Sequence, residues 1–305
     1  LTLAVLFFLV KLNEAQRIIT INYAKRVHGN SSYGGIKSIL PIKMIAAGVI
    51  PVIFATAFLS LPALIGQVIS SVNPGNEFFD LSKLGGIITK GTSLKPRSGN
   101  KPPRVCETAS GMLNSIGLQN PGVEYFAQND LPFLRKFDTA IIVNACGSTV
   151  DEYVELCKIL NGLDIDGVEL NLSCPNVKEG GIAFGQDPKL VEQITSDIKK
   201  IAKQPVIMKL SPNVTDITEM ARAAEAGGAD CLSLINTLTG MKIDIDRRTF
   251  VLANKTGGMS GPAIHPIAVR MVYQVANAVN IPIIGMGGIA SADDVIEMMM
   301  AGAPA

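Results

Sequence analysis

The sequence predicts an α/β protein, a parallel (β/α)₈ barrel of the TIM type that lacks its first and last strands, preceded by an α-helical membrane-type segment. From about residue 76 onward, short and nearly continuous apolar runs alternate with amphipathic stretches, which is typical of strands buried on both faces of a parallel sheet. Almost every run ends in polar residues, as strands do at the active-site mouth of such a barrel. Before residue 76, one uncharged stretch is long enough to cross a bilayer.

Composition supports two unlike parts, 1–75 and 76–305. The 305 residues are 48% hydrophobic and only 17% charged, so the chain is more apolar than a typical soluble enzyme. Residues 1–75 hold six basic and one acidic side chain, whereas the remainder holds 21 basic and 25 acidic ones. Neither part has the strongly basic face that nucleic-acid binding requires, so no nucleic-acid partner is expected.

The first part has the pattern of a membrane protein. Leu1–Val10 is apolar but too short to span, so we interpret it as the end of one membrane helix. The basic stretch Lys11–Lys43 would be a cytoplasmic loop by the positive-inside rule, although it could also be a simple solvated charge run. The segment 44–72 has no charge and predicts one membrane helix, placing this part at the inner membrane.

Three motifs of this part, NEAQRIITINYAKRVHG, YGG and LPIKMIAAGVIPVIFA, resemble the SecY subunit of the bacterial protein-conducting channel. The resemblance covers one loop and the helix after it. In that family this loop contacts the ribosome and the translocation motor, and a single intact helix cannot form a channel.

In the second part, the periodicity predicts six strands and four helices. The expected strands are GGIITK (85–90), AIIVNAC (140–146), GVELNLS (167–173), PVIMKLS (205–211), CLSLINT (231–237) and PIIGMGG (282–288). Apolar residues at helical spacing predict helices over 149–161, 188–203, 216–227 and 266–279. No GxGxxG opens a helix, which argues against a dinucleotide-binding sheet.

Six ordered motifs of this part, GGIITKGTSLKPRSGNKPPRVCETASGMLNSIGLQNPG, ELNLSCPNV, VIMKLSPNVTDI, LINTLTG, TGGMSGPAIHP and IIGMGGI, resemble the class 1 dihydroorotate dehydrogenases, and the NAD-linked 1B branch in particular. The resemblance implies a cytoplasmic enzyme that oxidises dihydroorotate to orotate with FMN in pyrimidine synthesis. It also implies a homodimer within a heterotetramer, whose partner subunit carries FAD and an iron–sulfur cluster.

The oxidation needs a base for the C5 proton and an acceptor for the C6 hydride. Cys174, just after a predicted strand, is the candidate base, provided that its surroundings favour the thiolate. The alternative is that Cys174 is a small buried apolar residue, which is the interpretation that we prefer for Cys106, Cys157 and Cys231. The five cysteines show no CxxC and no regular spacing, so we expect reduced thiols and no metal site.

Asparagine amides suit a pyrimidine because each offers both a donor and an acceptor. The resemblance implies that the substrate is bound by the following residues: Asn114, Asn171, Asn176, Asn236, Thr237 and the backbone of Gly117 and Leu118. Any single asparagine could instead be a turn or cap residue.

Lys90 and Lys209 each follow an apolar strand, where an unpaired charge would be costly to bury. We expect Lys209 at the N1–C2=O edge of the flavin and Lys90 against flavin and substrate; the alternative is an ion pair inside the barrel. Asn144 and Asn171 are assigned to the flavin as well. Gly261, Gly287 and Gly288 predict close backbone approach to its phosphate.

His265 is interpreted as a helix-start residue, not a metal ligand, because no acidic or histidine partner accompanies it. The resemblance implies that the first barrel strand should precede Phe78 and that the last strand should come just after Ala305, where the chain ends. We therefore hypothesise that fragments of two genes are joined near 72–77. The alternative to the enzyme is an inactive chimera, or a translocation fragment with a passive barrel remnant.

Overall fold

The computed structural model describes residues 16–22, 26–28, 31–33, 37–43, 81, 84–172 and 185–305. The chain divides into two compact units, Leu1–Phe79 and Asp80–Ala305. The division lies close to the predicted boundary at residue 75.

The described part of the first unit is made of strands. β1 (Gln16–Asn22) pairs antiparallel with β4 (Lys37–Lys43), with Gln16 opposite Lys43, and β2 (Arg26–His28) pairs antiparallel with β3 (Ser31–Tyr33). β-Branched residues dominate the middle of β1, and such residues favour extended backbone. The segment expected to be a cytoplasmic loop, Lys11–Lys43, therefore contains short antiparallel strands that the charge pattern did not indicate, and its place as a loop between membrane helices stays a prediction.

The predicted membrane helix 44–72 and the apolar stretch Leu1–Val10 lie outside the described residues. In the parts of the chain that the structure does describe, no helix combines the length and the apolar character that crossing a bilayer requires.

The second unit is built on one parallel sheet. Its principal strands are β5 (Gly86–Ile88), β9 (Ala140–Cys146), β10 (Gly167–Asn171), β11 (Val206–Lys209), β12 (Cys231–Leu234) and β17 (Ile283–Gly285). They neighbour one another in chain order, and the short β6 (Thr92–Ser93) pairs with the end of β9. A doubly wound sheet would reverse direction at a switch point, whereas this half-barrel does not. All six predicted strands are confirmed.

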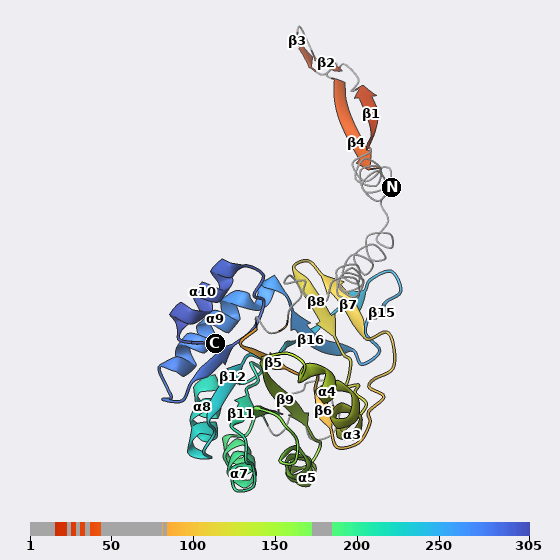
Figure 1. The fold of residues 1–305 in the computed structure, drawn as a ribbon. Helices are drawn as coiled ribbons and strands as arrows, with labels where there is room; N and C mark the ends of the chain where they lie inside the picture. The colour runs from red at the N-terminus through yellow and green to blue at the C-terminus, as the bar shows by residue number, and fades with distance from the viewer. Residues whose placement is uncertain are drawn as a thin grey trace. The chain divides into compact units, whose positions relative to one another are not determined.

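Helices cover the outer face of this sheet (Figure 1). The four predicted ones are α5 (Val150–Leu160), α7 (Pro188–Lys199), α8 (Ile217–Ala226) and α9 (His265–Ala276). Side chains of Thr149, Asp187 and Asp216 cap the first three by accepting hydrogen bonds from backbone N–H groups. A fifth, α10 (Ala292–Ala301), begins at a Ser291 capping box and was not predicted.

A second sheet, which the sequence did not predict, is antiparallel. It orders β13 (Leu238–Met241), β16 (Thr256–Ser260), β8 (Gly111–Asn114) and β7 (Val105–Thr108). Two still shorter strands, β14 (Ile243–Asp244) and β15 (Thr249–Phe250), pair beside it. Strands this short carry too few residues for an alternating pattern to be recognised.

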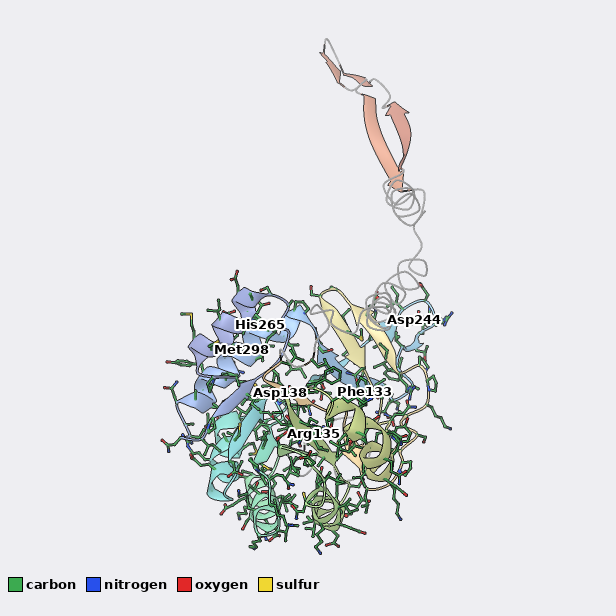
Figure 2. The ribbon with its side chains drawn as sticks, viewed as in Figure 1. Phe133, Arg135, Asp138, Asp244, His265 and Met298 are labelled. Carbon is green, nitrogen blue, oxygen red and sulfur yellow. The ribbon has the colours of Figure 1, made fainter. Side chains whose placement is uncertain are left out.

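Short helical turns connect β8 to β9: α3 (Val123–Tyr125), η3 (Phe126–Asp130) and α4 (Leu131–Leu134), which carries Phe133 (Figure 2). Within the described sheet, β5 pairs only with β9. Beside β5 lies a groove of about 560 Å³ whose wall includes Ile87, Tyr125, Phe126 and Phe133.

The hydrophobic core fills the space between the parallel sheet and its helices. Tyr153, Leu156 and Leu160, spaced along one face of α5, are fully buried against it. The Tyr153 hydroxyl donates to the backbone oxygen of Asn171 at 2.8 Å. This contact ties α5 to the end of β10, where predicted site residues begin.

Replacing Leu156 with Ala should lower the free energy of unfolding by roughly 2–5 kcal/mol, because it leaves a cavity in a close-packed core. Chemical denaturation followed by circular dichroism measures this change. Ile159→Ala, on the exposed face of the same helix, is the matched control and should cost far less. Equal losses in the two variants would contradict the assigned core face.

Candidate functional site

A cavity of about 450 Å³ lies at the carboxyl ends of the parallel strands. Its apolar wall includes Ile88, Ile116 and Met286. Nine residues predicted for the site also line it: Lys90, Asn114, Gly117, Leu118, Asn144, Asn171, Lys209, Asn236 and Thr237. Polar side chains from distant parts of the chain therefore converge here, as parallel strand ends allow, while their individual roles stay predictions.

Three asparagines, from just after β12, from β10 and from β9, form a directional chain of hydrogen bonds, which we call the amide relay: Asn236, Asn171 and Asn144. The Thr237 N–H donates to Asn236 Oδ1 at 2.8 Å. Asn236 Nδ2 donates to Asn171 Oδ1 at 3.1 Å, and Asn171 Nδ2 donates to Asn144 Oδ1 at 3.4 Å. Each amide thus accepts at oxygen and donates at nitrogen.

The relay ends at Glu169, a side chain with no solvent exposure. Its Oε1 accepts from Asn144 Nδ2 and, at 3.4 Å, from Lys209 Nζ, while its Oε2 accepts from Ser233 Oγ at 2.7 Å. Without such partners a buried carboxylate would cost several kcal/mol. The sequence analysis missed Glu169, although a lone acidic residue inside the apolar run GVELNLS was a usable signal.

Lys209 and Lys90, the two lysines predicted for the site, differ in their exposure to solvent. The Lys209 side chain is 17% exposed and pairs with Glu169 while lining the cavity. The ion pair named as the alternative is thus present, and the role of Lys209 at a flavin edge stays a prediction. Lys90 lines the cavity but is exposed. The argument that Lys90 needs a partner because it is buried is therefore wrong, since β5 ends the described row of strands.

The loop after β8 closes one side of the cavity in an unusual conformation. Gly117 and Leu118 have φ values of 75° and 55°. A Cβ on Gly117 would lie 2.6 Å from Cγ of Asn100, so this position requires glycine. Leu118 has no such freedom, and left-handed backbone costs a bulky residue about 1–3 kcal/mol. Strain of this kind is common where backbone is shaped for a ligand.

Gly261, Gly287 and Gly288 lie together but do not line this cavity. Their φ values are 109°, 133° and 68°. A Cβ on Gly288 would lie 2.6 Å from the Gly261 carbonyl oxygen and 2.9 Å from the His265 nitrogen. The glycines thus gather around the turn η4 (Pro262–Ile264) and the start of α9, where the missing side chains let neighbouring backbone segments approach one another closely.

His265 is the first residue of α9, as predicted (Figure 2), but it does have acidic partners. Its Nε2 lies 3.1 Å from Glu297 Oε2 and 3.7 Å from Asp294 Oδ1, and its Nδ1 lies 3.0 Å from the Gly287 oxygen. The expectation that no such partner exists was wrong because both acids come from the unpredicted α10. Hydrogen bonds from Ala290 and Ser291 lower the pKa of Asp294.

The described cysteines are free thiols. Burial raises the pKa of Cys157 to about 12 and that of Cys231 to about 11, as expected of small apolar residues that react poorly. Burial also raises the pKa of Cys106. Buried Cys146, which the sequence analysis did not assign, donates to Asn144 Oδ1 at 3.2 Å. Cys174 and Asn176 lie outside the described residues.

Comparison with known proteins gives two family matches. The dihydroorotate dehydrogenase family matches residues 71–305, and the SecY family matches residues 1–97. The two matches overlap around the predicted junction.

Curated relatives are similar over the second unit. The dihydroorotate dehydrogenase B (NAD(+)) catalytic subunit of Lachnoclostridium phytofermentans is 68% identical over 228 residues, 75% of this chain and 76% of that protein. The same-named subunits of Alkaliphilus oremlandii and Alkaliphilus metalliredigens are 60% and 59% identical, over 75% and 74% of this chain and 76% and 75% of those proteins. With these relatives and a family match over most of its length, the chain belongs to the dihydroorotate dehydrogenase family.

Proposed function

We propose that this chain is the catalytic subunit of an NAD-linked, class 1B dihydroorotate dehydrogenase that oxidises dihydroorotate to orotate in pyrimidine biosynthesis. The observation that carries the proposal is the convergence of Lys209 and the amide relay on one cavity, in a chain 68% identical to a catalytic subunit of that name. The finer architecture belongs to the same proposal: residues 76–305 form a TIM barrel without its first and last strands.

The cavity suits a flavin ring. Its apolar wall can contact a flat aromatic surface, and Lys209 supplies a cation with the amide relay beside it. A Cβ on Gly91 would lie 2.8 Å from the Cys146 sulfur and 3.0 Å from Asn144 Oδ1, so the backbone there stays close to the cavity wall. The Lys209 ammonium and the N–H groups of the amide relay are hydrogen-bond donors, and such donors match the carbonyl and nitrogen atoms along the edge of a flavin.

The residues divide the work as follows. FMN, when bound, would supply the acceptor for the hydride that leaves C6 of the substrate. Lys209 orients the N1–C2=O edge, assisted by Asn144 and Asn171, while Lys90 contacts flavin and substrate. The glycine group Gly261, Gly287 and Gly288 leaves room for the phosphate.

Four asparagines, Asn114, Asn171, Asn176 and Asn236, bind the pyrimidine together with Thr237. The backbone of Gly117 and Leu118 lies near the substrate carboxylate. The proton leaves C5 for the Cys174 thiolate, whose position shortly after β10 places it close in sequence to Asn171. The base and the substrate-binding amides would then share one strand end.

The electrons removed from dihydroorotate require a partner subunit that accepts them. The relatives are named catalytic subunits, which implies a separate electron-transfer subunit, and we assign FAD and the iron–sulfur cluster to it. A cluster needs several cysteines at one place, and the cysteines of the described residues do not gather. We propose a homodimer within a heterotetramer, acting in the cytoplasm.

For residues 1–75 we propose a SecY-derived segment with one membrane helix at 44–72, joined to the enzyme near 72–77. The overlap of the two family matches supports a junction there. Sequencing source DNA across codons 70–80 tests this, and separate reading frames in the source would confirm an artificial fusion. The rival function is an inactive chimera or translocation fragment, and purification without bound flavin, dependent on detergent, would favour that rival.

Cys174→Ser should lower kcat for dihydroorotate oxidation by roughly 10²-fold or more, since a positioned base contributes about 10²–10⁴. FMN content, measured by absorbance, should stay unchanged. Cys106→Ser, on β7 outside the cavity, is the matched control and should keep the wild-type rate. Unchanged turnover in Cys174→Ser would remove the assigned base.

Asn236→Ala should raise the KM for dihydroorotate by roughly tenfold, because losing one buried hydrogen bond costs about 1–2 kcal/mol. Steady-state kinetics with a dye acceptor measures the change. Asn277→Ala, on the exposed end of α9, serves as control. A KM equal to that of wild type would show that Asn236 does not bind the substrate.

A further inference from the structure

The proposed reaction makes no use of Glu169, yet this side chain is deeply buried and strongly engaged. Among the residues that the structure describes, Glu169 is the one acidic side chain in the buried class, with 0% exposure. It does not line the cavity. A charge kept beneath a binding site, at the energetic cost of burial, points to a role in that site.

The carboxylate connects four neighbouring strands. Glu169 lies on β10 and accepts from Asn144 at the end of β9, Lys209 at the end of β11 and Ser233 on β12. Since side chains alternate along a strand, Glu169 shares its face with Asn171, two residues later. Glu169 therefore lies directly below the part of the wall that Asn171 forms.

Hydrogen-bond direction follows from this position. An ionised carboxylate can only accept, so the Asn144 amide must present Nδ2 to Glu169 and Oδ1 to Asn171. Asn171 must then donate with Nδ2 and accept from Asn236 with Oδ1. Glu169 at one end of the amide relay, together with the Thr237 N–H at the other, thus fixes which atoms the relay presents.

The effective charge of Lys209 at the cavity follows from the same geometry. Lys209 is mostly shielded from water, and its Nζ lies 3.4 Å from Glu169 Oε1. At such a site the carboxylate offsets most of the lysine charge as seen from the cavity, because screening by solvent is weak. The cavity wall therefore presents a lysine whose charge is balanced by a carboxylate beneath it.

We infer that Glu169 is a positioning residue for this reaction: it orients the amide relay, holds Lys209, and limits how strongly that lysine favours a negatively charged flavin. The inference rests on the proposed function for its flavin. Reduced flavin carries more negative charge at the N1–C2=O edge than oxidised flavin does. Removing the Glu169 charge should therefore favour the reduced form.

The experiment uses the full chain loaded with FMN, as wild type and Glu169→Gln. In the variant, the ratio of the Kd of oxidised FMN to that of reduced FMN should rise about tenfold. For a two-electron couple this is a potential about 30 mV higher, measurable by dye equilibration. An unchanged or lower potential would overturn the inference.

Asp164→Asn is the matched control for charge. Asp164 pairs with Arg135 at 3.0 Å and is exposed, and it precedes β10, at the end of the strand opposite the cavity. Its removal changes the net charge equally and should leave the potential at the wild-type value. Glu169→Asp, which keeps the charge, should shift the potential less than Glu169→Gln; a shift as large would show that the effect comes from lost packing.

A second measurement needs no flavin. In Glu169→Gln, Lys209 should react with acetic anhydride several-fold faster than in wild type, with exposed Lys200 as the internal reference in peptide mass spectrometry. Equal acetylation rates of Lys209 in the variant and in wild type would show that Glu169 does not restrain Lys209. If the wild-type chain bound no FMN, the proposed function would fail. The acetylation rates would still show whether Glu169 restrains Lys209.

Discussion

The buried carboxylate of Glu169 is the constraint on which the polar architecture of this protein depends. A group that can only accept hydrogen bonds, surrounded by donors from neighbouring strands, leaves each of those donors one orientation. The orientation then passes outward through Asn144, Asn171 and Asn236. A cavity wall made of amides, which could otherwise rotate between equivalent arrangements, is given a single pattern of donors and acceptors by the charge beneath it and by the Thr237 N–H at its other end.

The fold makes that constraint possible. Parallel strands in chain order bring their carboxyl ends to one edge, so that residues 144, 171, 209 and 236 meet although they are far apart in sequence. The helices on the outer face exclude water from the sheet, and Tyr153 of α5 anchors the backbone of Asn171 from behind. Core packing and site geometry are therefore coupled: the element that buries the sheet also positions the end of β10.

Local patterns account for what could be predicted. Apolar runs and helical spacing depend on neighbouring residues, and they located all six strands and four helices. Polar residues at strand ends likewise indicated most of the cavity wall. Features that depend on distant partners were missed: the antiparallel sheet, in which Gly258 pairs with Asn114; the acids of α10 beside His265; and the exposure of Lys90. Glu169 was missed because its role depends on three other strands, none of which is visible from its own run.

The open side of β5 has a consequence for handling the protein. This strand pairs only with β9 in the described sheet, next to a groove walled by Tyr125, Phe126 and Phe133. Backbone groups along such an edge, beside apolar side chains, are a template on which another extended polypeptide can add. We therefore expect self-association at high concentration to begin at this margin of the sheet.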